Sequence, residues 1–421
     1  MDVLFLLACL LLIADVLVPE IWGSGKSKDY SLWYWAGEQI RYGQPLYERM
    51  TRGTFDFIYP PVSAILLALP TWFGKAPFYF FLSLLNVAAW WITGELSNAM
   101  TGSQRTPSPW LAALPGVVMV AFVFDQLDLG QPNLFLLALM LGGFWSLQKG
   151  RPVMGGFLFA LATAIKAFPI AVLPYLVWRR QWKASAGLIV WLGVLLLLVP
   201  APIRGFERNL TELTTWYQGM VGSTSDQGFG QRSEQNWSWI NQSVIAITHR
   251  LVRPVDYNHE GPKPTSQNQS KTMNIVSVDF KTANVIVLAV MALIGLGFIA
   301  VLPARHAMTP RSTADELGIL FCLMTIASPL ARQYYFIWLY FPVTVLMQRA
   351  VFDPRETVRT RTWGALLAAA ALLLLSLPVF PKLFQALGNN LAATFILIAA
   401  LIWHLRHPPK SSQVEPGIIT T

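Results

Sequence analysis

A series of long apolar segments separated by short polar loops constrains this chain more than any other feature. A helix needs about twenty residues to cross a bilayer, and by that measure there are about twelve candidate segments. They lie near 3–22, 77–97, 109–124, 131–147, 152–166, 168–178, 185–202, 280–302, 314–330, 333–348, 363–380 and 390–405. Only 13% of the residues are charged, against 54% hydrophobic. The sequence therefore predicts an all-α, polytopic helical membrane protein.

Lys and Arg gather in alternate loops, which predicts the orientation of the chain. The residues concerned are Arg105, Lys149, Arg151, Arg179, Arg180, Lys183, Arg305, Arg311, Arg349, Arg355, Arg359 and Arg361, with Arg406 and Lys410 in the tail. By the positive-inside rule, these loops and both termini are cytoplasmic. The first apolar segment has no Lys or Arg before it, so we interpret it as a retained helix. The net charge of +9 then reflects membrane orientation, and no nucleic-acid partner is expected.

We interpret the chain as one transmembrane domain, 1–421, with polar extracytoplasmic loops. The first such loop, 23–75, is predicted to be catalytic and to carry helices lying at the membrane surface, and the segment 406–421 to be a flexible cytoplasmic tail. The loop 204–278 starts with a helical pattern and then becomes rich in Gly, Ser, Asn and Gln. Polar residues from several loops are thus predicted on one extracytoplasmic face.

The first loop opens with Asp29 followed by the aromatic run Tyr30 to Trp35. Trp and Tyr favour the membrane interface, so this stretch is predicted to lie at the membrane surface. A carboxylate there could act as a general base toward a hydroxyl group. The alternative from position alone is a helix N-cap.

The turn from Asp125 to Asn133 contains Asp128, Gly130 and Gln131. Its carboxylates could bind a cation or a sugar hydroxyl, or cap the helix that begins at Pro132. No His, Cys, Asp or Glu cluster has the spacing of a closed metal site, and no phosphate-binding loop occurs, so neither metal nor cofactor is expected.

Two cations are predicted at the level of the polar face. Lys166 lies between two short apolar segments, and Arg332 follows Ser328-Pro329. An intramembrane cation is a candidate ligand of an anionic head group such as a lipid phosphate. The alternative for Lys166 is a side chain that snorkels to the interface.

Taken together, these residues and several others form an ordered set of landmarks. The set comprises Asp29, Tyr34, Ala36, Gly43, Tyr47, Tyr59-Pro60-Pro61, Gly130-Gln131-Pro132-Asn133, Gly155-Gly156, Lys166, Pro169, Asn241-Gln242-Ser243 and Ser328-Pro329. It resembles the bacterial polyprenyl-phosphate-mannose-dependent alpha-1,2-mannosyltransferases, glycosyltransferase family 87 of the GT-C fold class. The resemblance spans roughly residues 20 to 350. Where this family often has His after the Ser-Pro motif, this chain has Tyr334 and Tyr335.

The resemblance implies an inverting membrane glycosyltransferase that moves a hexose, first of all mannose, from a polyprenyl phosphate to a hydroxyl of a glycan or glycolipid acceptor. Asp29 would be the base, and Lys166 and Arg332 would hold the phosphate. The predicted sugar and acceptor contacts are Trp33, Tyr34, Tyr59, Asp128, Gln131, Asn133, Asn241, Gln242 and Tyr334. The expected place is the bacterial inner membrane, with an extracytoplasmic active site.

Two other classes of function are alternatives to a glycosyltransferase. A transporter or flippase of a lipid-linked saccharide also needs cations at depth, but such proteins commonly show two related halves, and no such symmetry is visible here. A structural subunit of an envelope complex would leave the polar landmarks without a purpose.

Overall fold

The structure is a computed structural model of the chain. It describes residues 14, 18, 28–48, 50–51, 54–55, 57–103, 109–222, 224–225, 228–229, 236–258 and 270–409. The predicted first apolar segment and the end of the tail lie almost wholly outside the described residues.

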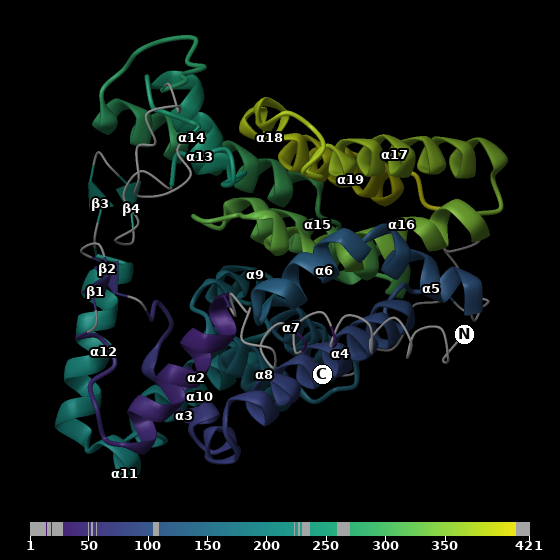
Figure 1. Cartoon of the computed structure of the whole chain (residues 1–421). Coiled ribbons are helices and arrows are strands. Elements are labelled where there is room, and N and C mark those ends of the chain that lie inside the picture. The colour runs from purple at the N-terminus through teal and green to yellow at the C-terminus, as the bar shows by residue number, and fades with distance from the viewer. Residues whose placement is uncertain are drawn as a thin grey trace. The chain divides into compact units, whose positions relative to one another are not determined.

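The described part is built almost entirely of helices (Figure 1). The helices and helical turns are α2 (Lys28–Arg41), α3 (Pro61–Ala68), η1 (Pro70–Phe73), α4 (Lys75–Ala99), α5 (Pro109–Val118), α6 (Val120–Leu129), α7 (Asn133–Gln148), α8 (Pro152–Ile165), η2 (Phe168–Ala171), α9 (Val172–Trp178), α10 (Trp182–Gly193), η3 (Val194–Leu198), α11 (Ala201–Arg204), α12 (Phe206–Met220), α13 (Val244–Val252), α14 (Phe280–Val301), η4 (Arg305–Ala307), α15 (Pro310–Ala327), η5 (Gln333–Leu339), α16 (Tyr340–Phe352), α17 (Glu356–Leu374), α18 (Lys382–Leu387) and α19 (Asn389–Arg406). Two antiparallel hairpins pair β1 (Met50–Thr51) with β2 (Thr54–Phe55) and β3 (Thr224–Ser225) with β4 (Gly228–Phe229). The predicted all-α class is confirmed.

Five described helices are long and apolar enough to cross a membrane, and a sixth span is possible if the bent pair α5–α6 counts as one. The five are Lys75–Ala99, Trp182–Arg204, Phe280–Val301, Gln333–Phe352 and Asn389–Arg406. Other predicted segments form shorter apolar helices, such as α7 and α8, which are below the length of a straight span. The membrane character is thus confirmed, whereas the number of about twelve spans stays a prediction.

The helices fall into two compact units. Unit 1 contains Met1–Thr93 and Val123–Ser233, and unit 2 contains Gly94–Phe122 and Glu234–Thr421. Asp29, the 128–133 turn and Lys166 therefore belong to unit 1. The Asn241 and Arg332 segments belong to unit 2.

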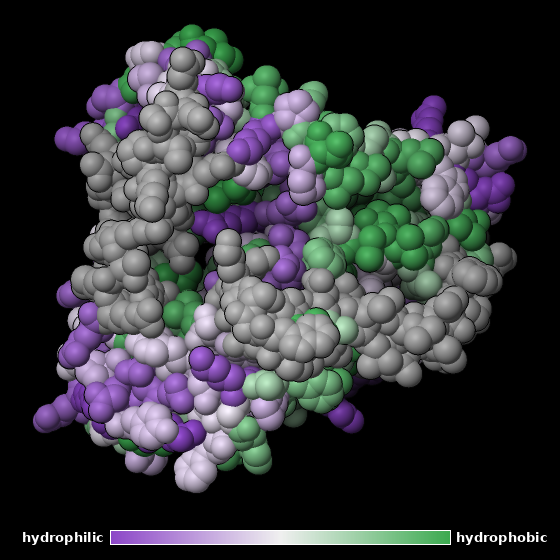
Figure 2. Space-filling model, viewed as in Figure 1, coloured by the Kyte–Doolittle hydropathy of each residue, from purple (hydrophilic) through white to green (hydrophobic). Residues whose placement is uncertain are grey.

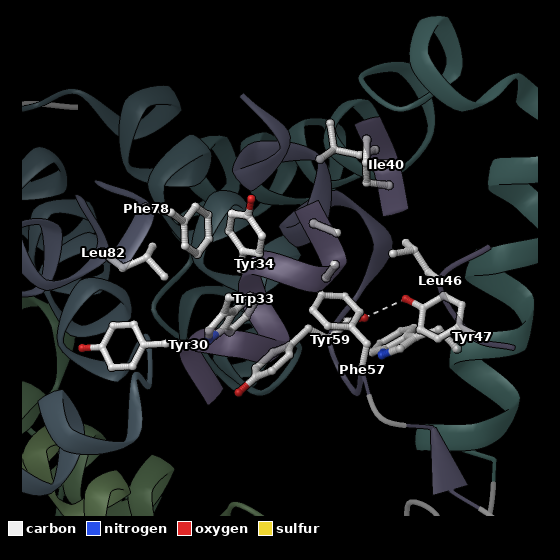
Figure 3. Packing of buried hydrophobic residues seen from close by; sticks show 14 of the residues in the cluster. Tyr30, Trp33, Tyr34, Ile40, Leu46, Tyr47, Phe57, Tyr59, Phe78 and Leu82 are labelled. Atoms are coloured by element: carbon white, nitrogen blue, oxygen red, sulfur yellow. Dashed lines mark hydrogen bonds between the residues drawn. The ribbon is translucent and has the colours of Figure 1, made fainter. Parts of the chain in front are cut away.

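An aromatic cluster forms the core of unit 1 (Figure 3). It joins α2 to the segment 57–59 and to the start of α4. Trp33 packs on Tyr59 with 4.2 Å between ring centroids, and Tyr34 meets Phe78 edge-on at 5.3 Å. Phe57 lies against Trp33 at 5.6 Å. Aromatic rings bury large areas with few rotatable bonds, so they hold α2 firmly in this core.

The loop after α2 is held by a buried ion pair in the same unit. Arg204 binds the carboxylate of Glu212 on α12 and donates to the carbonyl of Gln44 at 2.9 Å. Arg208 donates to the carbonyl of Gly43 at 2.7 Å. The predicted helix at the start of the long loop is confirmed as α12, and it holds the segment that follows α2.

Glycines allow α7, α8 and α10 to pack closely. A Cβ at Gly155 would lie 2.9 Å from the carbonyl oxygen of Gly143, and one at Gly156 would lie 2.7 Å from that of Ala184. Only glycine fits such contacts, as in many membrane helix pairs. The landmark Gly155-Gly156 therefore fixes the direction of α8, whose last residue is followed directly by Lys166.

Unit 2 has its core among α15, α16, α17 and α19. Arg349 and Asp315, both about 2% exposed, form an ion pair at 3.1 Å between α16 and α15. Arg349 is one of the basic residues whose loops are predicted to be cytoplasmic, and the ion pair shows that it also stabilises the core of unit 2. Figure 2 shows apolar surface over the part of unit 2 that holds α17. Leu367 and Leu374 of this helix are exposed.

Candidate active site

Asp29 lies in the first turn of α2 and is half-buried. This differs from the N-cap alternative, because the described helix already begins at Lys28. A carboxylate in the first turn is stabilised by the positive end of the helix dipole. Its Oδ2 accepts a hydrogen bond from Nε2 of Gln131.

Gln131 is the centre of the hydrogen-bond network in unit 1. While its Nε2 donates to Asp29, its Oε1 accepts from the hydroxyl of Tyr59 at 3.2 Å and from Nζ of Lys166 at 3.3 Å. Gln131 is 4% exposed. Residues from three distant parts of the sequence therefore meet on one amide.

The turn that carries Gln131 is fixed from α2. The indole N–H of Trp33 donates to the carbonyl of Gly130 at 2.9 Å, and the hydroxyl of Tyr30 donates to the carbonyl of Leu127 at 2.7 Å. Gly130 has φ = 72°, and a Cβ there would lie 2.7 Å from the ring of Tyr30. Both the backbone conformation and the close ring require glycine at this position.

Lys166 follows α8 in an extended conformation. Its Nζ donates to Oδ1 of Asn133 at 3.2 Å as well as to Gln131, and lies 5.7 Å from the ring centre of Tyr59. Asn133 in turn donates to Oε1 of Gln126 at 3.2 Å. Two amide oxygens thus hold the ammonium in place, and an amide oxygen does so without cancelling the charge of its partner.

The aromatic candidates take different positions around this network. Tyr59 touches it directly through its hydroxyl, while Tyr47 donates to the Tyr59 carbonyl at 2.7 Å (Figure 3). Trp33 and Tyr34 are buried in the aromatic core. Trp33 therefore shapes the site through Gly130, and a direct substrate contact from Trp33 or Tyr34 stays a prediction.

Asp128 is half-buried near the C-terminal end of α6, and its negative charge acts on Tyr30. Burial, with a smaller contribution from Asp128, raises the pKa of Tyr30 to about 12, so this phenol stays protonated and keeps donating to Leu127. The predicted sugar contact of Asp128 remains a prediction.

In unit 2, Asn241 and Gln242 are fully buried and organise the segment before Arg332. Asn241 donates to the carbonyl of Pro329 at 2.9 Å and accepts from the N–H of Ala331 at 3.0 Å. The backbone N–H of Gln242 donates to the carbonyl of Ala331 at 2.9 Å, and its side-chain Oε1 accepts from the backbone N–H of Asn390 at 2.9 Å. These contacts give both residues a structural role, and a direct substrate contact stays a prediction.

Arg332 and Tyr334 lie at the start of η5 and are half-buried. Tyr334 packs on Tyr335 with 5.3 Å between ring centroids. Because both belong to unit 2, their predicted contacts with phosphate and substrate stay predictions.

Sequence reasoning missed three residues that support these segments. Tyr30 and Gln126 fix the turn in unit 1, and Arg250 fixes the loop in unit 2. Arg250 is fully buried and donates to four backbone carbonyls, those of Trp237, Ser238, Asn241 and Ala386. The adjacency of Tyr30 to Asp29 was a usable signal for the first, whereas Gln126 and Arg250 show none in the sequence.

No group of three or more metal-ligating side chains occurs in the part of the chain that the structure describes. What unit 1 does bring together is a carboxylate, a cation and neutral hydrogen-bonding groups. Such a set can take a proton from a hydroxyl and stabilise a developing anion.

The sequence profile of glycosyltransferase family 87 matches residues 57–329. The chain belongs to glycosyltransferase family 87. The matched range includes Tyr59, the 128–133 turn, Lys166 and the Asn241 segment, and it ends at Pro329. This family 87 protein is thus an enzyme, a glycosyltransferase, and its apolar helices make it an integral membrane protein.

Among solved structures, the chain is similar to ArnT from Cupriavidus metallidurans, whose crystal structure has undecaprenyl phosphate bound. The TM-score is 0.42 at 12% identity, covering 96% of this chain and 77% of ArnT. No curated protein matches the chain.

Proposed function

We propose that this family 87 enzyme transfers a hexose, with mannose as the first expectation, from a polyprenyl phosphate to a hydroxyl of a glycan or glycolipid acceptor. The observation that carries the proposal is the network joining Asp29, Gln131 and Lys166 in unit 1. It brings a group suited to accept a proton close to one suited to hold a phosphate. The proposed site faces the extracytoplasmic side of a bacterial inner membrane.

In the proposed reaction, the Asp29 carboxylate takes the proton of the acceptor hydroxyl. The acceptor oxygen attacks the anomeric carbon from the face opposite the phosphate, and the bond from that carbon to the phosphate oxygen breaks. The electron pair leaves with the phosphate, giving polyprenyl phosphate and a glycoside of inverted configuration. The proton on Asp29 then passes to solvent.

Lys166 is the proposed phosphate ligand in unit 1. Its position at the end of α8 is fixed by the amide oxygens of Gln131 and Asn133. A cation held in advance stabilises the negative charge that develops on the leaving phosphate without having to reorganise during the reaction. Tyr59 and Asn133 border the same place and are proposed to contact the sugar. Arg332 is the second proposed phosphate ligand, on the basis of its place in the sequence as a cation at the level of the polar face.

The experiment is a transfer assay with purified enzyme in lipid nanodiscs, using polyprenyl-phosphate mannose labelled in the sugar and a glycolipid extract as acceptor. Asp29→Asn removes the base and should lower transfer by about a hundredfold or more. Asp279→Asn is the matched control, because Asp279 caps α14 and an asparagine can still accept from the Thr282 N–H.

Full activity of Asp29→Asn would overturn the base assignment. Transfer from a nucleotide sugar, with no transfer from the polyprenyl-phosphate sugar, would overturn the assignment of the donor. An unchanged melting profile of the Asp29→Asn enzyme is needed as evidence that the loss is chemical.

A further inference from the structure

The amide of Gln131 can face its neighbours in only one way. An ammonium has N–H donors and no acceptor, so the atom that meets Lys166 must be the carbonyl oxygen. The hydroxyl of Tyr59 adds a second donor to the same oxygen. The amide nitrogen is therefore directed at Asp29, and a flip would place N–H groups against the ammonium.

The backbone under this amide is equally fixed. The Gln131 N–H donates to the carbonyl of Gln126 at 3.0 Å, and the Gly130 N–H donates to that of Leu127 at 3.1 Å. Pro132 follows and restricts the backbone of Gln131 to extended conformations. The side chain starts from a rigid turn and is almost wholly buried, so it is poised before any substrate arrives.

This arrangement links the charge of Lys166 to the carboxylate of Asp29. A cation at an amide oxygen polarises the amide and makes its N–H a stronger donor. A hydrogen bond from that N–H favours the ionised carboxylate and holds it in one orientation.

We propose that Gln131 is the positioning residue of the acceptor base: its amide aims the Asp29 carboxylate and keeps it ionised, using Lys166 and Tyr59 as its supports. The inference rests on the proposed function of Asp29 and deepens it. It differs from a role of Gln131 as a plain sugar ligand, which would change the KM and leave the ionisation of the base alone.

The test is the pH dependence of transfer in Gln131→Leu and Gln131→Glu enzymes. Gln131→Leu removes a hydrogen bond to a charged group, an effect of about ten- to a hundredfold on kcat at neutral pH. In a plot of kcat against pH, the limb on the acid side should move to higher pH in this variant. Activity should therefore return in part as the pH rises. Gln131→Glu keeps an oxygen for Lys166 but adds a like charge beside Asp29, so its limb should move further.

Two comparisons separate a direct role from a structural one. Gln148→Leu makes the same change at the exposed last residue of α7, at the other end of that helix from Asn133, and should leave the pH profile of transfer unchanged. Tyr59→Phe should shift the acid-side limb in the same direction but by less. In the Gln131→Leu background it should cause no further shift of that limb, because Tyr59 acts on Asp29 through Gln131.

A raised KM with an unshifted pH profile in both Gln131 variants would overturn the proposal and make Gln131 a substrate ligand. An equal shift of the acid-side limb by Tyr59→Phe in both backgrounds would also overturn it. An active Asp29→Asn enzyme, measured in the same series, would instead overturn the proposed function itself.

Discussion

Asp29 and Lys166 are joined through a single side chain, the amide of Gln131, which donates to the carboxylate and accepts from the ammonium. One residue comes from the first turn of α2 and the other from the end of α8. The proton acceptor and the phosphate ligand of the proposed reaction are thus set relative to each other inside unit 1, by neutral groups on a rigid turn.

Replacing Lys166 by Met should weaken donor binding by about ten- to a hundredfold, since a hydrogen-bonded charge on the phosphate is lost. Binding of labelled polyprenyl-phosphate mannose to the purified enzyme measures this. Lys149→Met is the control, because Lys149 is an exposed cation lying over the Trp145 ring at 4.3 Å. Equal donor affinity in both variants would contradict the phosphate role of Lys166.

Gly130→Ala should be more damaging than Gly150→Ala. Both glycines have a positive φ, of 72° and 70°, so each substitution costs about 1–3 kcal/mol in backbone strain. At Gly130 the new methyl group also meets the Tyr30 ring, whereas nothing lies within 4 Å at Gly150. Thermal melting in detergent should show the larger decrease for Gly130→Ala, together with lower transfer activity. Equal melting points would contradict the close contact with Tyr30.

Arg250→Met should destabilise unit 2 by about 3 kcal/mol or more, because several buried carbonyls lose their donor at once. No carboxylate forms a salt bridge with Arg250 among the residues that the structure describes, so its role is to hold backbone groups. Folded yield and melting temperature measure the effect. Arg253→Met is the comparison and should cost less, because Arg253 is half-buried and lies against the Phe280 ring.

His249 should make the stability of unit 2 depend on pH between about 6.5 and 4. Burial, with the nearby Arg253, lowers the pKa of His249 to about 4. The arginine N–H faces Nδ1 at 3.3 Å, so Nδ1 must accept and Nε2 carries the proton toward Asn284. Adding a second proton to the ring would break this arrangement.

The sign follows from proton binding. In that window the unfolded chain binds a proton that the folded chain does not, so stability is present above pH 6.5 and is lost as the pH falls toward 4. His249→Gln should flatten this part of a plot of melting temperature against pH, while His407→Gln, at an exposed position, should not. An unchanged slope in His249→Gln would show that another group is responsible.

Much of the site could be predicted residue by residue, but not as an arrangement. Asp29, Gln131, Asn133 and Lys166 stand out in the sequence because a polar group beside an apolar segment needs a reason. The contacts among them join positions far apart in the chain, and no local pattern encodes such contacts. For the same reason Gln126 could not be predicted as the partner of Asn133.

The number of membrane-spanning helices was also beyond what the sequence alone could predict. Apolar stretches such as those of α7 and α8 were correctly located, yet each is too short for a straight span. Whether a short apolar helix crosses a membrane depends on its neighbours, which hydropathy along the chain does not contain.

What the sequence determined by itself is the class of protein and the family, because membrane character comes from composition and the landmarks come from residue order. What only the tertiary structure decided is which polar groups meet. Hydrogen bonds act over about 3 Å, so the role of Gln131 depends on how the α2, α6–α7 and α8 segments pack rather than on any one of them.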